Sequence, residues 1–338
     1  MQIGDFRPVP GHRVFLIAEI GINHEGSVEQ CARMIEQAAV AGADAVKLQT
    51  VDADENYVAG TESYKIFKHS ALSREETANM FDLARSLGVI PFTTVGDFRT
   101  LAWVEQLDPP AYKISSGLLT HLPLLKRIAA YGKPLLISSG MATEAEIDAA
   151  VNIARQQGNE QLTLFQCTSL YPAPLESLHL SVIPRMAERW GTEVGFSDHS
   201  LGDKAAQLAV AAGAVMLEKH FTLDSTRPGF DHGISLEPDG FKKMVAAVRR
   251  VEQIMGSPEK VLDEQLGRQQ RKFTRCLVAR QDIEPGDVFN EDNLAVKRPL
   301  LDQRGLEPSY YDRVLGRRSK RKLKHDEPVS TADVEGLD

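Results

Sequence analysis

The sequence GFSDHSLG at residues 195–202 and the sequence VMLEKHFTLDSTRPGFD at residues 215–231 decide the fold of this chain. Each includes or directly follows a short apolar run, at residues 192–196 and 215–217, that is typical of a buried strand. Residues 204–213 lie between the two runs, and they have the pattern of a helix that ends on glycine. The segment therefore predicts a strand–helix–strand unit with parallel strands.

A histidine lies at the end of each of these two strands. His199 closes the triplet Ser-Asp-His, and His220 closes the triplet Glu-Lys-His. Parallel strands joined by a helix end at the same edge of a sheet, so we expect the two imidazoles to lie together. With Asp198 and Asp231 nearby, they could hold a divalent metal ion and leave positions open for a substrate. The alternative is two histidines that are hydrogen-bonded separately at strand ends.

The same alternation of strand and helix recurs from the start of the chain. The other expected strands are residues 14–20, 45–49, 89–94, 111–115, 134–138 and 162–167. The helix after the second strand is delayed by an insertion, residues 50–73. Eight such units over about 250 residues predict an α/β fold of the (β/α)8 TIM-barrel type. An open doubly wound sheet is the alternative, but its Gly-rich phosphate loop is missing from AEIGINHEG after the first strand.

The pattern changes after Met255, which divides the chain into parts. We expect the barrel domain over residues 1–256 and a polar, charged linker over residues 257–272. Short apolar runs separated by turns, such as the EPGD turn at residues 284–287, then predict a small β-rich domain over residues 273–338, with a short helix near residues 308–315.

Composition and charge exclude several classes of protein. Apolar residues make up 42% and charged residues 25% of the chain, which is typical of a globular protein with a large core. The net charge of −8 argues against general binding to nucleic acid. The three cysteines form neither a zinc pattern nor a disulfide framework, and no apolar run approaches the roughly 18 residues of a membrane span. We therefore expect a cytoplasmic protein without a membrane or nucleic-acid partner.

Polar and ionisable residues recur where the expected strands end, which is where TIM barrels carry their active sites. Besides the histidines, they include Glu19, Lys47, Gln49, Thr94, Lys113, Ser115, Ser116, Ser138, Ser169 and Tyr171. A barrel with only a structural role has no need of such residues at the same end of every strand. The pattern therefore predicts an active site.

Two subsets of these residues suggest specific chemistry. Lys113 with Ser115, Ser116 and Ser138 is typical of a cradle for a phosphate or carboxylate group. The alternative is a salt-bridged lysine beside serines that cap helices. Glu19 follows an apolar run, and burial could raise its pKa and suit it to general acid–base work. An ion pair between Glu19 and Lys47 is the alternative, and both roles are compatible.

Several stretches together resemble the N-acetylneuraminate (sialic acid) synthase family, which includes legionaminate and pseudaminate synthases and a spore-coat polysaccharide branch. They are AEIGINHEGS, AGADAVKLQT, PAYKISSG, GKPLLISSGMAT, CTSLYPAP, GFSDHSLG and LEKHFTLD. The C-terminal run ARQDIEPGDVFNEDNLAVKRP resembles the antifreeze-like (SAF) domain of the same family. The resemblance covers essentially the whole chain, in order and at matching spacing.

The resemblance implies a transferase that condenses phosphoenolpyruvate with an open-chain N-acyl hexosamine. N-acetylmannosamine is the expected acceptor, and the products would be N-acetylneuraminate and phosphate. The alternative acceptors are a 2,4-diacetamido-hexose, as for legionaminate or pseudaminate synthases, and a 6-phosphorylated sugar. Two readings from other classes are a Schiff-base lyase that uses Lys113 and a non-catalytic sugar-binding protein of surface polysaccharide assembly.

The resemblance also implies roles for single residues. His199 and His220 match the metal ligands, with Mn²⁺ expected and Mg²⁺ or Co²⁺ as alternatives. The positions that match phosphoenolpyruvate contacts are Lys47, Lys113, Ser116 and Ser138, and Glu19 matches an acidic residue near both substrates. The positions on the acceptor side are Gln49, Thr94, Ser169, Tyr171 and Asp231. Ser169 replaces the asparagine of the bacterial sialate enzymes, so this departure lies on the acceptor side.

The family resemblance further implies a homodimer in which the SAF domain of one subunit covers the barrel mouth of its partner. An arginine of that domain reaches the N-acyl group of the acceptor, and Arg298 in VKRP is the matching residue. The usual RPGxG is replaced here by RPLLDQRG, so Arg304 is a second candidate.

Overall fold

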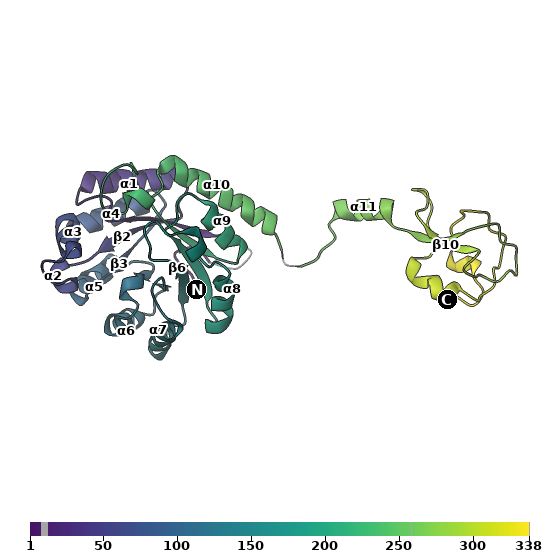
Figure 1. The fold of residues 1–338 in the computed structure, drawn as a ribbon, viewed down its shortest axis with the longest axis horizontal. Helices are drawn as coiled ribbons and strands as arrows, with labels where there is room; N and C mark the ends of the chain where they lie inside the picture. The colour runs from purple at the N-terminus through teal and green to yellow at the C-terminus, as the bar shows by residue number, and fades with distance from the viewer. Residues whose placement is uncertain (8–12, 258, 338) are drawn as a thin grey trace. The chain divides into compact units, whose positions relative to one another are not determined.

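The computed structural model describes residues 1–7, 13–257 and 259–337. The chain forms two compact units, Met1–Pro258 and Glu259–Asp338. The first unit is a closed barrel in which eight consecutive strands pair in parallel (Figure 1), as the alternation of strands and helices predicted. The strands are β1 (Phe15–Gly21), β2 (Ala45–Thr50), β3 (Ile90–Val95), β4 (Tyr112–Ile114), β5 (Leu135–Ser138), β6 (Leu162–Cys167), β7 (Glu193–Asp198) and β8 (Met216–His220).

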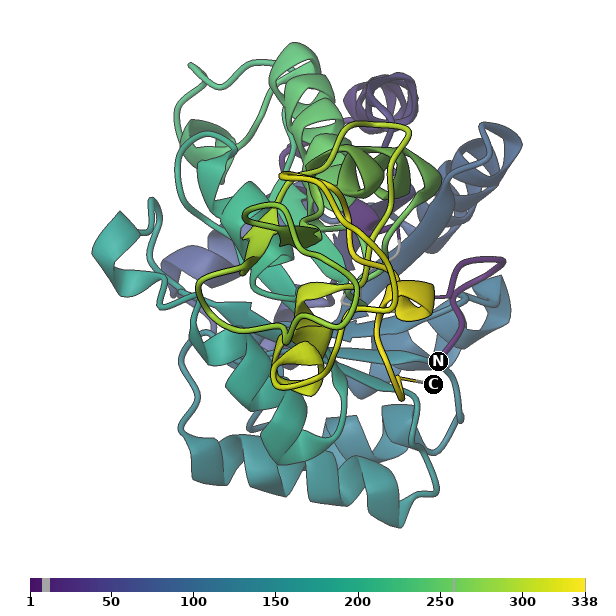
Figure 2. The same ribbon diagram turned by 90° about the vertical axis from the view of Figure 1, so that its right-hand side faces the viewer.

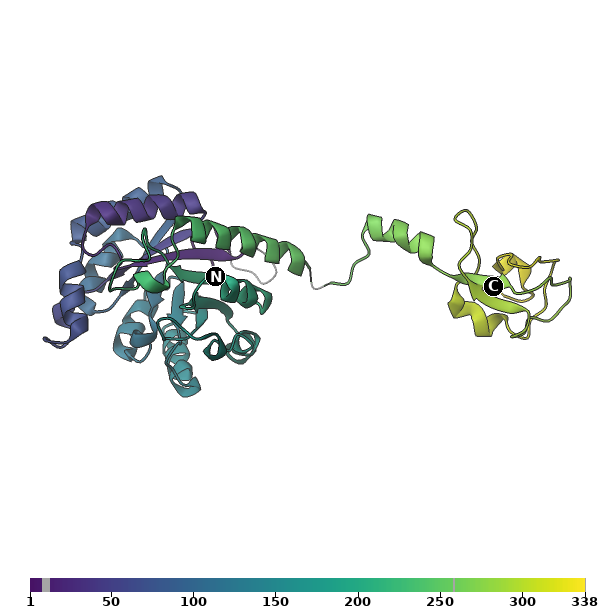
Figure 3. The ribbon, with the colours of Figure 1, turned by 45° about the horizontal axis from the view of Figure 1, so that its top comes forward.

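Helices surround the barrel, as Figures 1 and 3 show. They are α1 (Val28–Ala41), α4 (Arg74–Ser86), α5 (Phe98–Val104), α6 (Leu122–Ala129), α7 (Glu144–Gln156), α8 (Val182–Trp190), α9 (Lys204–Ala211) and α10 (Pro238–Met255). Their starts follow from local sequence: Ser73 and Glu76 form a capping box at α4, and Thr143 and Glu146 form one at α7. The main apolar core lies between these helices and the strands.

The inside of the barrel changes from apolar residues at the start of the strands to mostly polar and charged residues at their carboxyl ends. Phe15 and Ile17 of β1 belong to a buried apolar cluster that also contains Phe92 and Phe165. Glu19, two positions further along β1, lines a cavity instead. Side chains alternate between the two faces of a strand, so every second residue points inward. The apolar half therefore supports the barrel, and the charged half at the carboxyl ends forms the site.

The insertion after β2 contains two helices that the sequence analysis did not anticipate. They are α2 (Ala53–Asn56) and α3 (Glu62–Ser70), which begin at side-chain caps supplied by Asp52 and Thr61. Tyr57 and Phe67 join the insertion through stacked rings whose centroids are 5.1 Å apart. The insertion is therefore an ordered part of the barrel mouth.

The second unit has a small core of its own. Its strands β9 (Cys276–Ala279) and β10 (Leu294–Lys297) pair in an antiparallel manner, and its turns and loops can be followed in Figure 2. Helix α12 (Tyr311–Val314) confirms the short helix that was expected near residues 308–315. Helix α11 (Glu264–Phe273) lies largely in the segment that the sequence analysis assigned to a linker. None of the described helices is both long and apolar enough to cross a membrane.

Candidate functional site

A cavity of about 550 Å³ opens at the carboxyl ends of the barrel strands. Its volume lies within the roughly 300–1,000 Å³ of typical small-molecule sites. It brings together nearly all the barrel residues that the sequence analysis selected. They are Glu19, Lys47, Gln49, Lys113, Ser115, Ser116, Ser138, Ser169, Tyr171, His199, His220 and Asp231.

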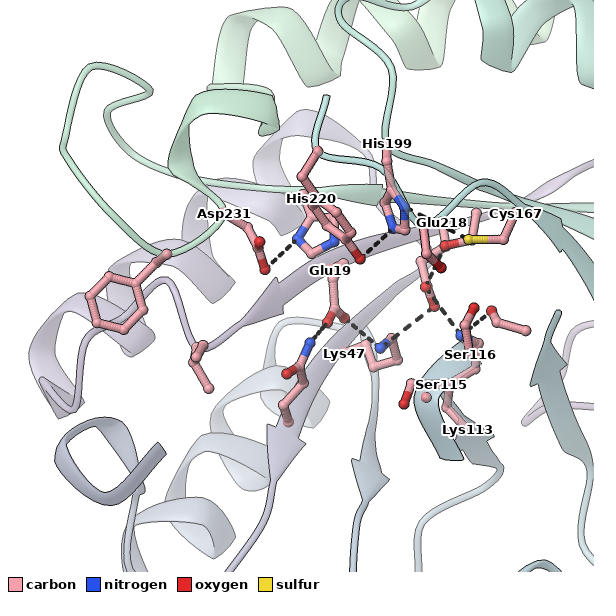
Figure 4. Close-up of a pocket in the computed structure, with 18 of the residues that line it drawn as sticks. Glu19, Lys47, Lys113, Ser115, Ser116, Cys167, His199, Glu218, His220 and Asp231 are labelled. Carbon is pink, nitrogen blue, oxygen red and sulfur yellow. Dashed lines mark hydrogen bonds and ion pairs between the residues drawn. The ribbon is translucent and has the colours of Figure 1, made fainter. Parts of the chain in front are cut away.

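The floor of the cavity carries two lysines and two glutamates, which we call the mouth cluster: Glu19, Lys47, Lys113 and Glu218. Lys47 Nζ lies 2.8 Å from Glu19 Oε2 and 3.7 Å from Glu218 Oε2. Lys113 Nζ lies 3.2 Å from Glu218 Oε1. The predicted ion pair between Glu19 and Lys47 is therefore present, and Glu218 links both lysines (Figure 4).

Burial and neighbouring charges separate the pKa values of the two glutamates. Burial raises the pKa of Glu19, against the opposing effect of Lys47. Burial acts in the same direction on Glu218, but Lys113 and Lys47 outweigh it and lower the pKa of Glu218 to about 2. Glu218 is thus a permanent anion, and Glu19 is the carboxyl group suited to proton transfer.

The pKa values of the two lysines in the cluster also shift in opposite directions. Burial would lower the pKa of Lys47, but the carboxylates of Glu19 and Glu218 outweigh it and raise this pKa. For Lys113 burial dominates and its pKa is lowered, although Glu218 opposes the shift.

Unpartnered polar atoms are concentrated in this cavity. Four buried side-chain nitrogen or oxygen atoms of the described residues make no hydrogen bond, and three of them are Glu19 Oε2, Glu218 Oε2 and His220 Nδ1. Glu19 Oε2 has only the close ion pair with Lys47, without regular hydrogen-bond geometry. Buried polar groups without partners are uncommon and costly, so these atoms mark where a ligand would complete the network.

Hydroxyl groups surround Lys113, as the predicted cradle requires. Lys113 Nζ donates to Ser138 Oγ at 2.7 Å, and Ser197 Oγ donates to Glu218 Oε1 at 2.9 Å. Ser116 Oγ accepts from the backbone N–H of Gly140 at 3.0 Å. A Cβ atom at Gly140 would collide with the side chains of Ser116, Cys167 and Ser169, so only glycine lets this loop approach. The arrangement suits an oxygen-rich anion.

The two histidines lie together, as their placement on neighbouring strands predicted. Asp198 of β7 pairs with Lys219 of β8, which places His199 beside His220 with ring centroids 5.3 Å apart. His199 Nδ1 lies 2.9 Å from the carbonyl oxygen of Thr168, so this nitrogen carries the proton. Its Nε2 therefore has a free lone pair, and the Tyr171 hydroxyl lies 3.2 Å away. Burial lowers the pKa of His220, which favours its neutral, metal-binding form.

These imidazoles fit a shared metal ion. Two rings that bind one ion at about 2.1 Å through adjacent positions have centroids roughly 5 Å apart, which is close to the observed separation. The hydrogen bond from His199 Nδ1 to a carbonyl is the outer contact that usually orients a metal-binding histidine. Among the described residues, no group of three or more His, Cys, Asp or Glu side chains could hold a metal. Other ligands of an ion here would be substrate or water.

Two aspartates were expected beside the histidines, and only Asp231 lies on the cavity side with them. Asp198 points away from the cavity: its Oδ2 lies 3.0 Å from Lys219 Nζ, and its Oδ1 accepts from the backbone and hydroxyl of Ser200. The strand alternation that turns His199 and His220 inward turns Asp198 and Lys219 outward. The prediction that Asp198 could help to hold a metal ion with these histidines is therefore wrong. Asp231 Oδ2 lies 3.6 Å from His220 Nδ1, on the cavity side.

The remaining candidates have identifiable surroundings. Gln49 donates to Glu19 Oε1 at 2.8 Å, and Tyr171 stacks on His199 with centroids 4.2 Å apart. Thr94 is buried beneath Lys47, from which it accepts a hydrogen bond at 3.1 Å. Cys167 is buried and also lines the cavity, with Sγ 3.7 Å from His199 Nδ1.

Sequence reasoning missed Glu218 and Ser197 as site residues. Each lies two positions before a selected histidine, and alternation along a strand points such residues to the same face. The spacing Glu-Lys-His could have identified Glu218. Its partners could not be read from the sequence, because Lys113 lies 105 positions away.

The two arginines proposed for the acceptor lie in the second unit. The Arg298 guanidinium lies over the ring of Phe273, 4.7 Å from its centroid. Arg304 Nη1 donates to the carbonyl oxygens of Gln303, at 2.7 Å, and Leu301, at 3.3 Å. Both contacts are internal to this unit.

Comparison with known proteins places these observations in a family. Residues 34–260 match the NeuB family, and residues 274–335 match the SAF domain. The chain is 34% identical to a pseudaminic acid synthase of Campylobacter jejuni, over 99% of this chain and 100% of that protein. It is 35% identical to the spore coat polysaccharide biosynthesis protein SpsE of Bacillus subtilis, over 95% and 93%. The solved N-acetylneuraminic acid (sialic acid) synthetase of Leptospira borgpetersenii, in complex with citrate, aligns with a TM-score of 0.77 at 30% identity, over 80% of this chain and 94% of that one.

Proposed function

The chain belongs to the NeuB family of sialic and nonulosonic acid synthases, and from this premise we propose that it condenses phosphoenolpyruvate with an open-chain N-acyl hexosamine. One observation carries the proposal. A cradle of lysines and serines faces a pair of histidines across a single cavity, and buried carboxylate oxygens of Glu19 and Glu218 in that cavity make no hydrogen bond. A purely structural barrel, or a protein that only binds sugar, has no reason to bury these charges at this cost.

The proposed reaction forms one carbon–carbon bond and breaks one carbon–oxygen bond. C3 of phosphoenolpyruvate bonds to the aldehyde carbon of the acceptor, and water adds to C2. Phosphate then leaves with the bridging oxygen. The water loses both of its protons: one goes to the aldehyde oxygen and the other leaves with the phosphate, so the net reaction releases a 2-keto acid and hydrogen phosphate.

The chain's own residues have distinct tasks in this proposal. Lys113, Ser138 and Ser116 bind the phosphate and carboxylate of phosphoenolpyruvate, because they offer compact positive charge beside hydroxyl groups. Lys47 adds charge at the centre of the cavity. Glu19 moves the proton, because burial raises its pKa toward the working pH and its Oε2 makes no hydrogen bond besides its ion pair with Lys47.

His199 and His220 would hold a divalent ion, with Mn²⁺ expected. Such an ion supplies a Lewis acid for the aldehyde oxygen when it is bound. The Tyr171 hydroxyl lies 3.2 Å from His199 Nε2, and it would be available to the acceptor if that nitrogen held the ion. We further propose a cytoplasmic homodimer in which Arg298 or Arg304 of one subunit contacts the acceptor bound by the other.

The experiment is phosphate release from phosphoenolpyruvate with Mn²⁺ and a panel of N-acyl hexosamines, with and without EDTA. We expect release that requires both an acceptor and the metal. A sugar-binding protein would release none, and a Schiff-base lyase would form pyruvate from a keto acid without any phosphate. Either result contradicts the proposal.

A matched pair of variants tests the metal assignment. His220→Ala should abolish metal-dependent turnover and weaken Mn²⁺ binding measured by calorimetry, while phosphoenolpyruvate still binds. His232→Ala serves as the control, because His232 is buried nearby but contacts Glu25 and Thr222 instead of the cavity. Full activity of His220→Ala would contradict the assignment of His220 as a metal ligand.

A further inference from the structure

The loop that follows β8 supplies Asp231 to the cavity. It runs over residues 221–237, between β8 and α10. Backbone bonds close its base: the N–H of Thr222 donates to the carbonyl oxygen of Leu236 at 3.0 Å, and the N–H of Leu236 donates to that of His220 at 2.8 Å. These bonds fix where the loop leaves the strand and where it returns. They do not fix Asp231, which lies between the two ends.

The segment that carries Asp231 has a strained backbone. Phe230 has a φ of 50°, in the left-handed region that is unfavourable for a residue with a Cβ atom. Asp231 follows with φ −106° and ψ 16°, in the sparsely populated region between helix and strand. Such a conformation persists only where the surrounding structure fixes it. Contacts from outside the loop must therefore hold this segment.

Asn23 supplies these contacts with its whole side chain. It lies just after β1 and is 1% exposed. Its Oδ1 accepts from the backbone N–H of Asp231 at 3.1 Å. Its Nδ2 donates to the carbonyl oxygen of Phe221 and to Ser235 Oγ, both at 3.0 Å, and Ser235 Oγ donates to the carbonyl oxygen of Asp231 at 2.6 Å. Asn23 thus ties the start of the loop, the strained segment and the end of the loop to β1.

The position of Asp231 matters because of the group that its carboxylate faces. Its Oδ2 lies 3.6 Å from His220 Nδ1, and Figure 4 shows the two groups opposite each other. His220 Nδ1 is buried and makes no hydrogen bond with the described residues. A carboxylate at this place favours a proton on Nδ1 and leaves Nε2 with the lone pair that an ion would take. The carbonyl oxygen of Thr168 has the same relation to His199.

We infer that Asn23 is a positioning residue for the metal site: it holds Asp231 in place, and Asp231 orients His220. The inference rests on the proposed function and gives this task to a residue that does not itself line the cavity. Without the Asn23 side chain, the N–H of Asp231 loses its acceptor and the strained segment can relax, which moves the carboxylate relative to His220. Outer contacts of this kind typically change metal affinity or activity by about 10- to 100-fold.

The first measurement is Mn²⁺ affinity, determined by calorimetry on the whole chain. Asn23→Ala should weaken Mn²⁺ binding by about tenfold, and Asp231→Ala by about 10- to 100-fold. Steady-state kinetics on Asn23→Ala should show a lower kcat with an unchanged KM for phosphoenolpyruvate. The reason is that Lys113 and Ser138 of the cradle lie on β4 and β5, across the closed barrel from β1.

Asn159→Ala is the matched control. Asn159 is 2% exposed, and its Nδ2 donates to the carbonyl oxygens of Lys133, at 2.9 Å, and Ala129, at 3.3 Å. Its Oδ1 accepts from the N–H of Gln161 at 2.9 Å. It makes the same kinds of bond as Asn23, but it precedes β6, at the end of the barrel opposite the cavity. Both alanine variants should lose stability in urea, whereas Asn159→Ala should leave Mn²⁺ affinity and kcat unchanged.

A double-mutant cycle separates positioning from a general loss of structure. If Asn23 acts through Asp231, Asn23→Ala should change Mn²⁺ affinity by less than about twofold once Asp231 is replaced by alanine. Ser235→Ala is a milder variant for the same cycle if Asn23→Ala does not fold. It removes the hydroxyl that bonds to both residues and should weaken Mn²⁺ binding by about threefold.

The outcomes distinguish this inference from the proposed function. Wild-type Mn²⁺ affinity in folded Asn23→Ala, an equal loss in Asn159→Ala, or additive losses in the cycle would overturn the inference and leave the proposed function standing. A wild-type protein that neither binds Mn²⁺ nor releases phosphate overturns both.

Discussion

Two buried groups of charges meet at β8, where Glu218 of the mouth cluster faces the cavity and Lys219, which pairs with Asp198 of β7, faces away from it. The two groups differ in how completely their polar atoms are hydrogen-bonded. The mouth cluster leaves Glu19 Oε2 and Glu218 Oε2 without a hydrogen bond. The rear pair, Asp198 with Lys219, is fully satisfied. Lys219 also donates to the carbonyl oxygen of Ser200, and Asp198 Oδ1 accepts from the Ser200 backbone at 2.8 Å and hydroxyl at 2.7 Å.

The difference shows how one sheet serves two purposes. Burying a charge stabilises a protein only when its partners are complete, so the rear pair fixes the ends of the strands that carry the histidines. A cluster that keeps open hydrogen-bonding positions is costly for stability and useful for binding. The comparison therefore predicts that changes at the rear pair alter folding and that changes at the mouth cluster alter chemistry.

The largest expected effect is at the rear pair. Lys219→Met leaves Asp198 buried without its counter-charge and should lower the free energy of unfolding by about 3–5 kcal/mol. Urea unfolding followed by tryptophan fluorescence measures this effect for the barrel alone, because both tryptophans, Trp103 and Trp190, lie in the first unit.

A double variant provides the control. Asp198→Asn with Lys219→Met removes both charges and should recover much of the lost stability, since no uncompensated charge remains. A cost of less than about 1 kcal/mol for Lys219→Met would contradict the structural role of the rear pair.

The second prediction concerns proton transfer at the mouth. Glu19→Gln should reduce phosphate release by about 100-fold or more, because an amide cannot transfer the proton. Its stability at pH 7 should be equal to or above that of the wild type. Burial raises the pKa of Glu19 above its unfolded value of 4.5, so the folded state holds this proton more tightly than the unfolded state. The wild type therefore loses stability as the pH rises from 4.5 through the folded pKa of Glu19. Phosphate release checks the expected loss of activity, and thermal unfolding checks the expected stability. A Glu19→Gln variant that stays active but is destabilised would contradict both expectations.

The third prediction is a pH dependence with the opposite sign. The pKa of Glu218 is lowered to about 2 in the folded state, so its contribution to stability is present above pH 4.5 and is lost as the pH falls toward 2. The wild type should lose up to about 3 kcal/mol of unfolding free energy from this group in that range. Glu218→Gln should remove this part of the acid dependence.

Other carboxylates titrate in the same range, so the control is a glutamate outside the cluster. Glu188→Gln on the exposed face of α8 should keep the wild-type acid dependence. Equal acid dependence in Glu218→Gln and Glu188→Gln would refute the assignment.

The smallest expected effects are those of two serine substitutions. Each serine donates a hydrogen bond to a carboxylate, one in the mouth cluster and one in the rear pair. Ser197 donates to Glu218 at 2.9 Å, and Ser200 donates to Asp198 at 2.7 Å. Each Ser→Ala change should cost about 1–2 kcal/mol of interaction energy. For Ser197→Ala we expect a several-fold rise in KM for phosphoenolpyruvate, and for Ser200→Ala a loss of stability with KM unchanged. Steady-state kinetics and urea unfolding on both variants measure these effects. Equal changes of KM and of stability in the two variants would contradict the proposed difference between the mouth cluster and the rear pair.

The sequence by itself determined the barrel and most residues of the site. Strands and helices alternate because local patterns of apolar residues fix each element, and parallel strands bring their carboxyl ends together. The placement of His199 and His220, the ion pair of Glu19 with Lys47, and the lysine–serine cradle all follow from these local rules. Each depends only on where a strand ends and which neighbours it has.

Only the tertiary structure decided which charges face the cavity and which partners they find. Asp198 and Glu218 look alike in the sequence, yet a difference of one position along a strand turns Asp198 outward and Glu218 inward. Closure of the barrel then brings Glu218 to Lys113 across 105 positions, and the insertion after β2 folds so that Tyr57, Ile66 and Phe67 line the cavity. These contacts arise from packing between distant segments, which no local pattern encodes.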